Sequence, residues 1–418
     1  MTQARSCRLA LALLSLLSSW QLLAASETVP APAQPAPSQP SPLADVDRFN
    51  YAIGTQTFSP AYQFTQQTRL VETAEAIREM GATVIKFEMS RRYARKNGNI
   101  PLPNPEMDSL TKLARDEPSH RKVLDMPFAY YVMWAHTFCG GDADWRRGFD
   151  KPAQAAEYRE MYDFVAYLLK TYNGSGKTFY LGHWEGDGWM RGSVAPENDA
   201  KVTPERVQRM VDWLNTRQRA VDDAKRNTPH AGVEVWHYTE VNHVKLAMQG
   251  RKAVVNEVLP KTTVDFVSYS SYDTAKKPDE LKAALSFIES KLPPKPGIPG
   301  KRVFIGEYGF PSSRWSPAEQ EALSRNVMRA GLEWGCPFIL YWELYNNEVD
   351  ENGKQRGFWL IDNQANKQPV YYTHQRLNQW GRQYVAEFTK TNHHPPSFDE
   401  YRKAALAFLD KLPVATQN

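Results

Sequence analysis

Two glutamates in the sequence each stand where an apolar, strand-forming run ends. Glu185 lies in the stretch FYLGHWEGDGW, and Glu307 lies in the stretch VFIGEYGFP. Because a carboxylate inside a core is costly unless it is paired, each side chain either has structural partners or borders a site. Two carboxyl groups in different environments, one protonated and one ionised, can cleave a glycosidic bond. The pair therefore indicates acid–base chemistry on such a bond, provided that the fold brings both residues together.

The rest of the chain predicts a fold that could do this. Short apolar runs occupy residues 49–54, 83–87, 127–134, 178–181, 233–237, 264–269, 303–305 and 338–342. Amphipathic stretches separate them, at residues 68–80, 153–172, 204–225, 279–292 and 317–334 among others. This alternation predicts parallel strands, and eight units favour a single α/β domain, a (β/α)8 TIM barrel with extended βα loops. A doubly wound open sheet is the alternative, although no Gly-rich phosphate turn follows the first run.

A barrel would gather the residues that follow these runs at one mouth, because the carboxyl ends of its strands carry the catalytic groups. The ends of the runs are polar and aromatic. They contain Lys86, Glu88 and Arg91, then Trp134 and His136, then His183, Trp184, Glu185 and Asp187, then His237, Tyr238, Glu240 and Asn242, then Tyr269, Tyr272 and Asp273, then Glu307 and Tyr308, and finally Trp342, Glu343 and Asn346. We therefore expect Glu307 at a mouth and not in a core.

At these positions the sequence resembles the superfamily of retaining glycoside hydrolases with (β/α)8 barrels, the clan of cellulases, mannanases and β-galactosidases. The resemblance spans residues 49–380 and depends most on IGEYG around Glu307 and on Trp342. It implies that Glu185, after the fourth strand, is the general acid/base and that Glu307, after the seventh, is the nucleophile. It also implies a Tyr from the sixth strand near the nucleophile, for which Tyr269 is in register.

The sequence departs from the family pattern at two places. The family usually has Asn directly before its acid/base Glu, where this chain has Trp184. That Asn binds the sugar hydroxyl next to the anomeric carbon, and either His183 or Asn242 could replace it. The family also has an Arg after the second strand, a role for which Lys86, Arg91 and Arg92 all compete.

Two acidic residues near Glu185 add to the analysis. Glu240, after the fifth strand, is the rival for the acid/base role. Asp187 is expected to raise the pKa of Glu185 by like-charge repulsion. The candidate substrate-binding residues are Trp134, His136, His183, Trp184, Asp187, Glu240, Asn242, Tyr269, Tyr272 and Trp342, with Trp189 as a further sugar platform.

Two other functions remain open on the sequence. A carbohydrate-binding barrel without catalysis is one, because Trp184 replaces the expected Asn. A metal-dependent barrel hydrolase is the other, if His136, His183 and His237 cluster with Asp187, although no pair among them has local ligand spacing. The favoured reading needs no metal and no cofactor, and its partner is an oligo- or polysaccharide. Nucleic acid is not expected, since the net charge is only +4 and no basic block has interleaved aromatics.

The N-terminus predicts export to the periplasm or the extracellular space. Arg5 and Arg8 precede an apolar stretch at residues 9–24, with Ala25 and Ser26 after it. This is the pattern of a signal peptide at residues 1–25, and a Pro/Ala/Ser-rich linker follows at residues 26–45. No stable membrane insertion is expected once the signal is cleaved.

The mature chain is expected to form the catalytic barrel at residues 46–385 and a C-terminal helical tail at residues 386–418. Cys139 and Cys336 fall at opposite ends of strands in this register. A strand spans nearly 20 Å, whereas disulfide Cα atoms lie within about 7 Å. Two free thiols are therefore predicted.

Overall fold

The computed structural model describes residues 42–98, 100, 104–140, 144–193 and 199–413. The predicted signal peptide and all but the last residues of the predicted linker lie outside these ranges. None of the described helices is both long and apolar enough to cross a membrane.

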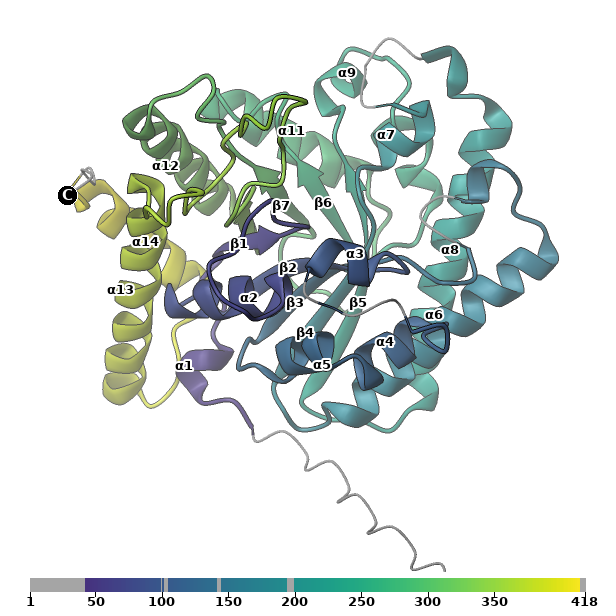
Figure 1. Ribbon diagram of the computed structural model, residues 1–418, viewed down its shortest axis with the longest axis horizontal. Helices are drawn as coiled ribbons and strands as arrows, with labels where there is room; N and C mark the ends of the chain where they lie inside the picture. Colours follow the sequence, from purple (N-terminus) through teal and green to yellow (C-terminus); the bar gives the residue numbers. More distant parts are fainter. Residues whose placement is uncertain (1–41, 99, 101–103, 141–143, 194–198, 414–418) are drawn as a thin grey trace, which may run out of the picture. The chain divides into compact units, whose positions relative to one another are not determined.

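Eight parallel strands close into a barrel in sequence order, as predicted (Figure 1). The strands are β1 (Ile53–Thr57), β2 (Val84–Met89), β3 (Tyr130–Ala135), β4 (Lys177–Gly182), β5 (Val233–Val241), β6 (Phe266–Ser270), β7 (Val303–Tyr308) and β8 (Ile339–Tyr341). The single (β/α)8 barrel is thus confirmed, and the open sheet is wrong.

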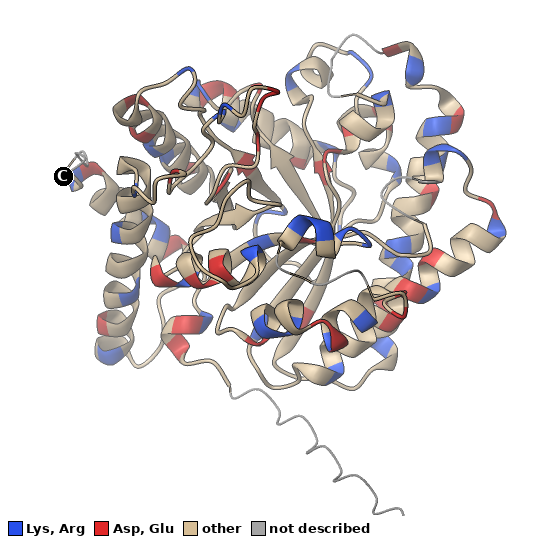
Figure 2. Ribbon diagram, in the orientation of Figure 1, with Lys and Arg blue, Asp and Glu red and all other residues tan. Residues whose placement is uncertain are grey.

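Helices cover the outside of the barrel, and most of the charged residues lie on them and on the loops (Figure 2). The α-helices are α1 (Asp45–Arg48), α2 (Arg69–Glu79), α3 (Tyr93–Asn97), α4 (Leu110–Asp116), α5 (Pro118–Asp125), α6 (Lys151–Thr171), α7 (Gly186–Arg191), α8 (Pro204–Asn227), α9 (Val244–Met248), α10 (Val254–Glu257), α11 (Pro278–Lys291), α12 (Pro317–Trp334), α13 (Pro369–Asn392) and α14 (Phe398–Lys411). Short 3-10 turns are η1 (Asp144–Arg146), η2 (Asp199–Lys201) and η3 (Leu259–Lys261). Several helices begin with side-chain caps, such as the Ser316 capping box of α12.

Aromatic rings fill the inside of the barrel. Tyr180, Tyr238, Phe304 and Phe338 belong to one buried cluster with the apolar strand residues around them. Gly182 makes room for one of these rings, since a Cβ at this position would lie 2.3 Å from the Tyr238 ring. The lower layers of the barrel are therefore a packed core, and only the top of the barrel is left for polar groups.

Three strands differ most from the predicted runs at their carboxyl ends. β1 begins later than predicted, so its carboxyl end lies at Thr57 instead of residue 54. β5 and β7 continue further, to Val241 and Tyr308, so that Glu240 and Glu307 lie inside strands instead of after them. Each predicted run stops short of the strand end, and the strand continues because the polar side chains beyond the run have buried partners at the top of the barrel.

The C-terminal part packs on the barrel. α13 continues without a break through residue 385, where the tail was predicted to begin. Tyr401 of α14 donates a hydrogen bond to the Tyr51 carbonyl at 3.2 Å, and the rings of Trp380 and Phe408 stack with centroids 4.7 Å apart. Cys139 and Cys336 are both unpaired, which confirms the two free thiols.

Candidate active site

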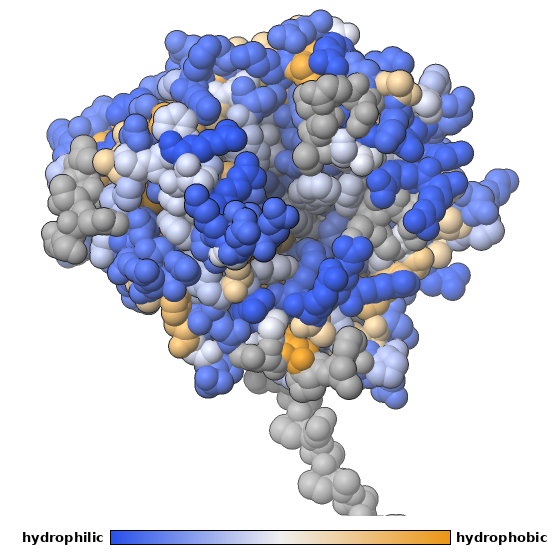
Figure 3. All heavy atoms as spheres, turned by 45° about the horizontal axis from the view of Figure 1, so that its top comes forward, coloured by the Kyte–Doolittle hydropathy of each residue, from blue (hydrophilic) through white to orange (hydrophobic). Residues whose placement is uncertain are grey.

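A cleft of about 960 Å³ opens at the carboxyl ends of the strands. Figure 3 shows this hollow with hydrophilic residues around it. Among the residues predicted for the site, those that line the cleft are Trp134, His136, Trp184, Glu185, Asn242, Tyr272, Glu307 and Trp342. Both predicted catalytic glutamates therefore border the same cavity.

Glu307 lies on the floor of the cleft, at the end of β7, with only 2% of its surface exposed. Lys86 Nζ donates a hydrogen bond to Glu307 Oε1 at 3.1 Å, and Tyr272 OH donates to Oε2 at 3.2 Å. Burial raises the pKa of Glu307 to about 8, while the charge and the hydrogen bond of Lys86 act to lower it. Glu307 is therefore buried against a cationic partner and also borders the cleft. The expectation that it lies at a mouth and not in a core is only partly correct.

Glu185 reaches the cleft from the turn between β4 and α7. Asn242 Nδ2 donates to Glu185 Oε2 at 3.1 Å, and within the described residues no Lys or Arg forms an ion pair with this carboxyl group. Burial raises the pKa of Glu185 well above its usual value, and the charges of Glu307, Glu240 and Asp187 raise it further. The predicted effect of Asp187 is present, but it is smaller than the effects of burial and of the other two carboxylates.

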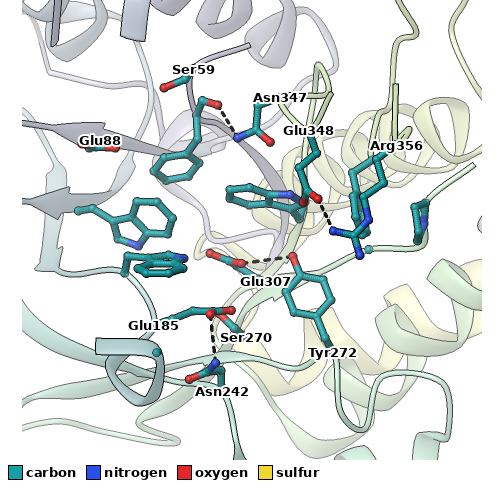
Figure 4. Close-up of a pocket in the computed structure, with 18 of the residues that line it drawn as sticks. Ser59, Glu88, Glu185, Asn242, Ser270, Tyr272, Glu307, Asn347, Glu348 and Arg356 are labelled. Carbon is teal, nitrogen blue, oxygen red and sulfur yellow. Dashed lines mark hydrogen bonds and ion pairs between the residues drawn. The ribbon is translucent and has the colours of Figure 1, made fainter. Parts of the chain in front are cut away.

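The two carboxyl groups thus lie in unequal surroundings. Figure 4 shows them next to each other in the cleft, with Asn242 beside Glu185 and Tyr272 beside Glu307. A cation and a phenol stabilise the ionised form of Glu307, whereas the carboxyl group of Glu185 accepts a hydrogen bond from an amide and pairs with no Lys or Arg in the described part of the chain. Glu307 therefore ionises first, and Glu185 keeps its proton to higher pH.

Lys86 is fully buried and joins the acidic groups from below. Its Nζ donates to Glu240 Oε2 at 2.8 Å and to the Gly306 carbonyl at 3.1 Å, in addition to Glu307. Burial lowers the pKa of Lys86, but the charges of Glu240 and Glu307 more than offset this and hold the pKa above its usual value. Of the three basic residues that competed on the sequence, Lys86 is the one in contact with Glu307, and Arg92 lines the cleft further out.

Glu240 is not on the wall of the cleft. Its Oε1 accepts a hydrogen bond from the backbone N–H of Glu185 at 3.1 Å, and its Oε2 accepts from Ser268 Oγ at 2.7 Å as well as from Lys86. Glu240 therefore touches the backbone of one candidate catalytic residue and the cation of the other. This position suits a residue that orients the other two, and the acid/base role of Glu240 stays a prediction.

The remaining predicted site residues that do not line the cleft support those that do. Asp187 accepts from the backbone N–H of Asn242 at 3.2 Å and so fixes the residue that holds Glu185. His183 bonds Thr239 Oγ1 at 2.8 Å and stacks on Trp189. Tyr269 bonds Thr274 and Asp273, and it is Tyr272 that reaches the nucleophile candidate.

Two of the histidines considered for a metal, His183 and His237, have protein hydrogen-bond partners. His237 Nδ1 contacts Gln218 Oε1 at 3.2 Å, while the ring of His183 bonds Thr239. Across the described residues, no group of three His, Cys, Asp or Glu side chains is arranged to hold a metal ion.

Sequence reasoning missed several residues of the cleft. Phe58 directly follows β1 and contacts two other rings of the cleft: its ring is tilted against Trp134, with centroids 3.9 Å apart, and stacked on Trp342, with centroids 5.3 Å apart. The misplaced end of the first strand hid it, because the residue directly after a barrel strand is the signal to look for. Many of the other missed lining residues come from the loops after β7 and β8, and these include Arg314, Trp315, Asn347, Glu348, Arg356 and Phe358.

Glu343, which the sequence predicts only as the end of a strand, supports the part of the cleft wall formed by Phe58 and Asn347. It is fully buried and accepts hydrogen bonds from the backbone N–H groups of Phe58 and Asn347, each at 3.0 Å. Both of these residues line the cleft. The Glu after Trp342 is thus a structural acid beneath the aromatic wall.

No protein-family model and no curated protein matches this sequence. Solved structures match it in fold. One is a GH5_18 glycoside hydrolase from Streptomyces cattleya in complex with Manb1-4GlcNAc, with 12% identity, 81% of each chain covered and a TM-score of 0.52. Another is a GH5_18 protein from Bifidobacterium longum subsp. infantis, with 14% identity, 78% of each chain covered and a TM-score of 0.50.

A third similar structure is the exo-beta-1,4-mannosidase Op5Man5 from Opitutaceae bacterium strain TAV5, with 12% identity and a TM-score of 0.50. The match covers 79% of this chain and 60% of that one. The resemblance to barrel glycoside hydrolases that the sequence indicated is therefore confirmed at the level of the fold.

Proposed function

We propose that this protein is an exported glycoside hydrolase that cleaves its substrate by a retaining double displacement. Glu307 is the nucleophile and Glu185 is the general acid/base. The observation that carries the proposal is the unequal environment of two carboxyl groups in one cleft. Lys86 forms an ion pair with Glu307, whereas no Lys or Arg of the described residues pairs with Glu185, and burial and three neighbouring carboxylates raise the pKa of Glu185 more than the charge of Lys86 lowers it.

The two residues would act in two steps. A Glu307 oxygen attacks the anomeric carbon as the bond to the leaving oxygen breaks, and Glu185 gives its proton to that oxygen. Glu185, now ionised, takes a proton from a water molecule that attacks the glycosyl ester and releases Glu307. Phe58, Trp134 and Trp342 offer aromatic faces on which a sugar ring can stack.

Two conservative substitutions test these roles. Glu307→Gln removes the nucleophilic charge, so turnover should fall by several orders of magnitude on every substrate. Glu185→Gln should depress turnover most for poor leaving groups, because activated aryl leaving groups need little protonation. The measurement is kcat on a panel of aryl glycosides and polysaccharides, with β-mannosides first because similar structures carry mannose-containing ligands or names.

A thermal melt of each variant shows whether the fold survives. Undiminished turnover in folded Glu307→Gln would contradict the proposal. If wild type binds glycans but hydrolyses none of them, the barrel is a binding protein without catalysis.

Export has its own test. Expression with secretion in a bacterial host should give an exported protein that lacks roughly the first 25 residues, the usual length of a signal peptide. Intact-mass measurement of that protein checks this, and an exported chain that keeps Met1 would contradict it.

A further inference from the structure

The charged residues that line the cleft are sorted by exposure. The exposed ones are all basic, and we call them the basic rim: Arg92, Lys276, Arg314 and Arg356. The acidic ones are half-buried or buried: Glu88, Glu185, Asp273, Glu307 and Glu348. A cleft whose outer charges share one sign concentrates ligands of the opposite sign. The basic rim therefore favours an anionic ligand.

Two members of the basic rim keep their charge unneutralised. Lys276 follows β6 and Arg314 follows β7, and neither has an acidic side chain within 4.0 Å in the described part of the chain. Lys276 Nζ lies instead over the Trp315 ring, 5.2 Å from its centroid. Arg356 differs, because it pairs with Glu348 and also lies over Phe358.

Aromatic rings line the cleft both beside the candidate nucleophile and beside the basic rim. Tyr272, which bonds Glu307, lies edge-on to Phe358 with centroids 6.1 Å apart. Phe358 and Trp315 both line the cleft, each with a cation over its ring. A sugar ring stacked on such a face would place its substituents within reach of Lys276 or Arg314.

We propose that the cleft binds a glycan that carries anionic substituents, carboxylate or sulfate, with a charged sugar unit beside Trp315, Lys276 and Arg314. This inference rests on the proposed function for the position of the bond that is cleaved, but the binding itself does not depend on catalysis. A neutral glycan would leave both cations without a partner.

Affinity electrophoresis of the Glu307→Gln protein tests the inference, because this variant does not consume the probe. The acidic probes are polygalacturonate for carboxylate and dextran sulfate for sulfate, and the neutral counterparts are fully methyl-esterified pectin and dextran. We expect at least one acidic probe to retard the protein and its neutral counterpart not to do so. The two arms show which anion the cleft takes.

Charge variants then locate the binding. Lys276→Gln and Arg314→Gln should each weaken retardation by up to about fivefold, the range of exposed ion pairs, and Arg314→Lys should restore most of the loss. The matched control is Lys170→Gln, an exposed lysine in the last turn of α6, which precedes β4 and so lies at the opposite end of the barrel. This control should bind as the parent does.

Three results would overturn the inference. They are no retardation by either acidic probe, equal retardation by the neutral probes, and an equal loss of retardation in Lys170→Gln, which would mean general attraction to a basic protein.

Hydrolysis is measured separately with the wild-type protein. Binding that depends on Lys276 and Arg314 without hydrolysis of any glycan contradicts only the proposed function. Hydrolysis of neutral glycans without acidic binding contradicts only this inference.

Discussion

The ionisation of Glu307 depends on two groups of opposite charge, Lys86 and Glu240, which contact each other below it. Lys86 lowers the pKa of Glu307, whereas the charge of Glu240 raises it. We therefore expect Lys86→Met to move the ascending limb of the kcat/KM profile to higher pH. Glu240→Gln should move the same limb to lower pH.

The measurement is a pH profile of each variant on an activated aryl glycoside, after a thermal melt has confirmed the fold. The test depends on the opposite directions of the two shifts. General damage to the site would reduce activity, but it would not move the ascending limb to higher pH in one variant and to lower pH in the other. Shifts in one direction for both variants would contradict the electrostatic roles given to these residues.

Glu185 also predicts a stability effect at the residue scale. Its folded pKa lies well above the usual value, first because of burial. The proton on Glu185 therefore stabilises the folded protein fully below the unfolded pKa, and this stabilisation is lost as pH rises through the folded pKa. Gln does not titrate, so the Glu185→Gln variant does not lose this stabilisation as the pH rises. The Tm of the variant minus the Tm of wild type should therefore increase between pH 4 and pH 8. A difference in Tm that does not change with pH would contradict the raised pKa.

At the scale of the elements, the apolar runs were sufficient to place all eight strands and to predict which of them deliver Glu185 and Glu307. The apolar runs did not predict the strand ends, because the side chains at the carboxyl ends of the strands inside the barrel are polar. Gln56 continues β1 by bonding the Gly306 and Tyr341 carbonyls, and Glu240 continues β5 by bonding Lys86. These partners are distant in sequence, so no local pattern announces them.

Contacts between residues distant in sequence also explain why the sequence predicted Tyr269 beside the nucleophile and missed residues in the loop after β8. Tyr269 and Tyr272 are both aromatic residues at the end of the sixth run, and only the turn of the chain after β6 directs Tyr272 to Glu307. The loop after β8 contributes Glu348, Arg356 and Phe358 to the cleft although it carries no regular pattern.

Packing inside the barrel gives a prediction for β4. A Cβ at Gly182 would meet the Tyr238 ring at 2.3 Å, and this ring is enclosed by other aromatic side chains. Gly182→Ala should therefore lower the free energy of unfolding by about 1–3 kcal/mol, the usual effect of overpacking, as measured by urea denaturation. The matched control is Gly148→Ala, where a Cβ would meet nothing within 4 Å. Equal stability of the two variants would contradict the tight contact.

At the scale of the whole described molecule, the aromatic residues serve two purposes that composition alone does not separate. Tyr180 and Phe338 fill the base of the barrel, whereas Trp134 and Trp342, in the same buried cluster, also face the cleft. Height along the barrel axis decides between core and sugar platform. That height follows from strand register, which the apolar runs predict only to within a few residues.

The exposed cysteine has a consequence for how the folded protein would behave in an oxidising compartment. Burial, followed by the charges of Glu157 and Glu160, raises the pKa of the Cys139 thiol well above its usual value. Cys336 is fully buried behind the barrel wall. Disulfide exchange proceeds through the thiolate, so neither sulfur is a ready nucleophile once the chain has folded. The folded protein should therefore persist in air without covalent dimers, although both Cys139 and Cys336 are free thiols.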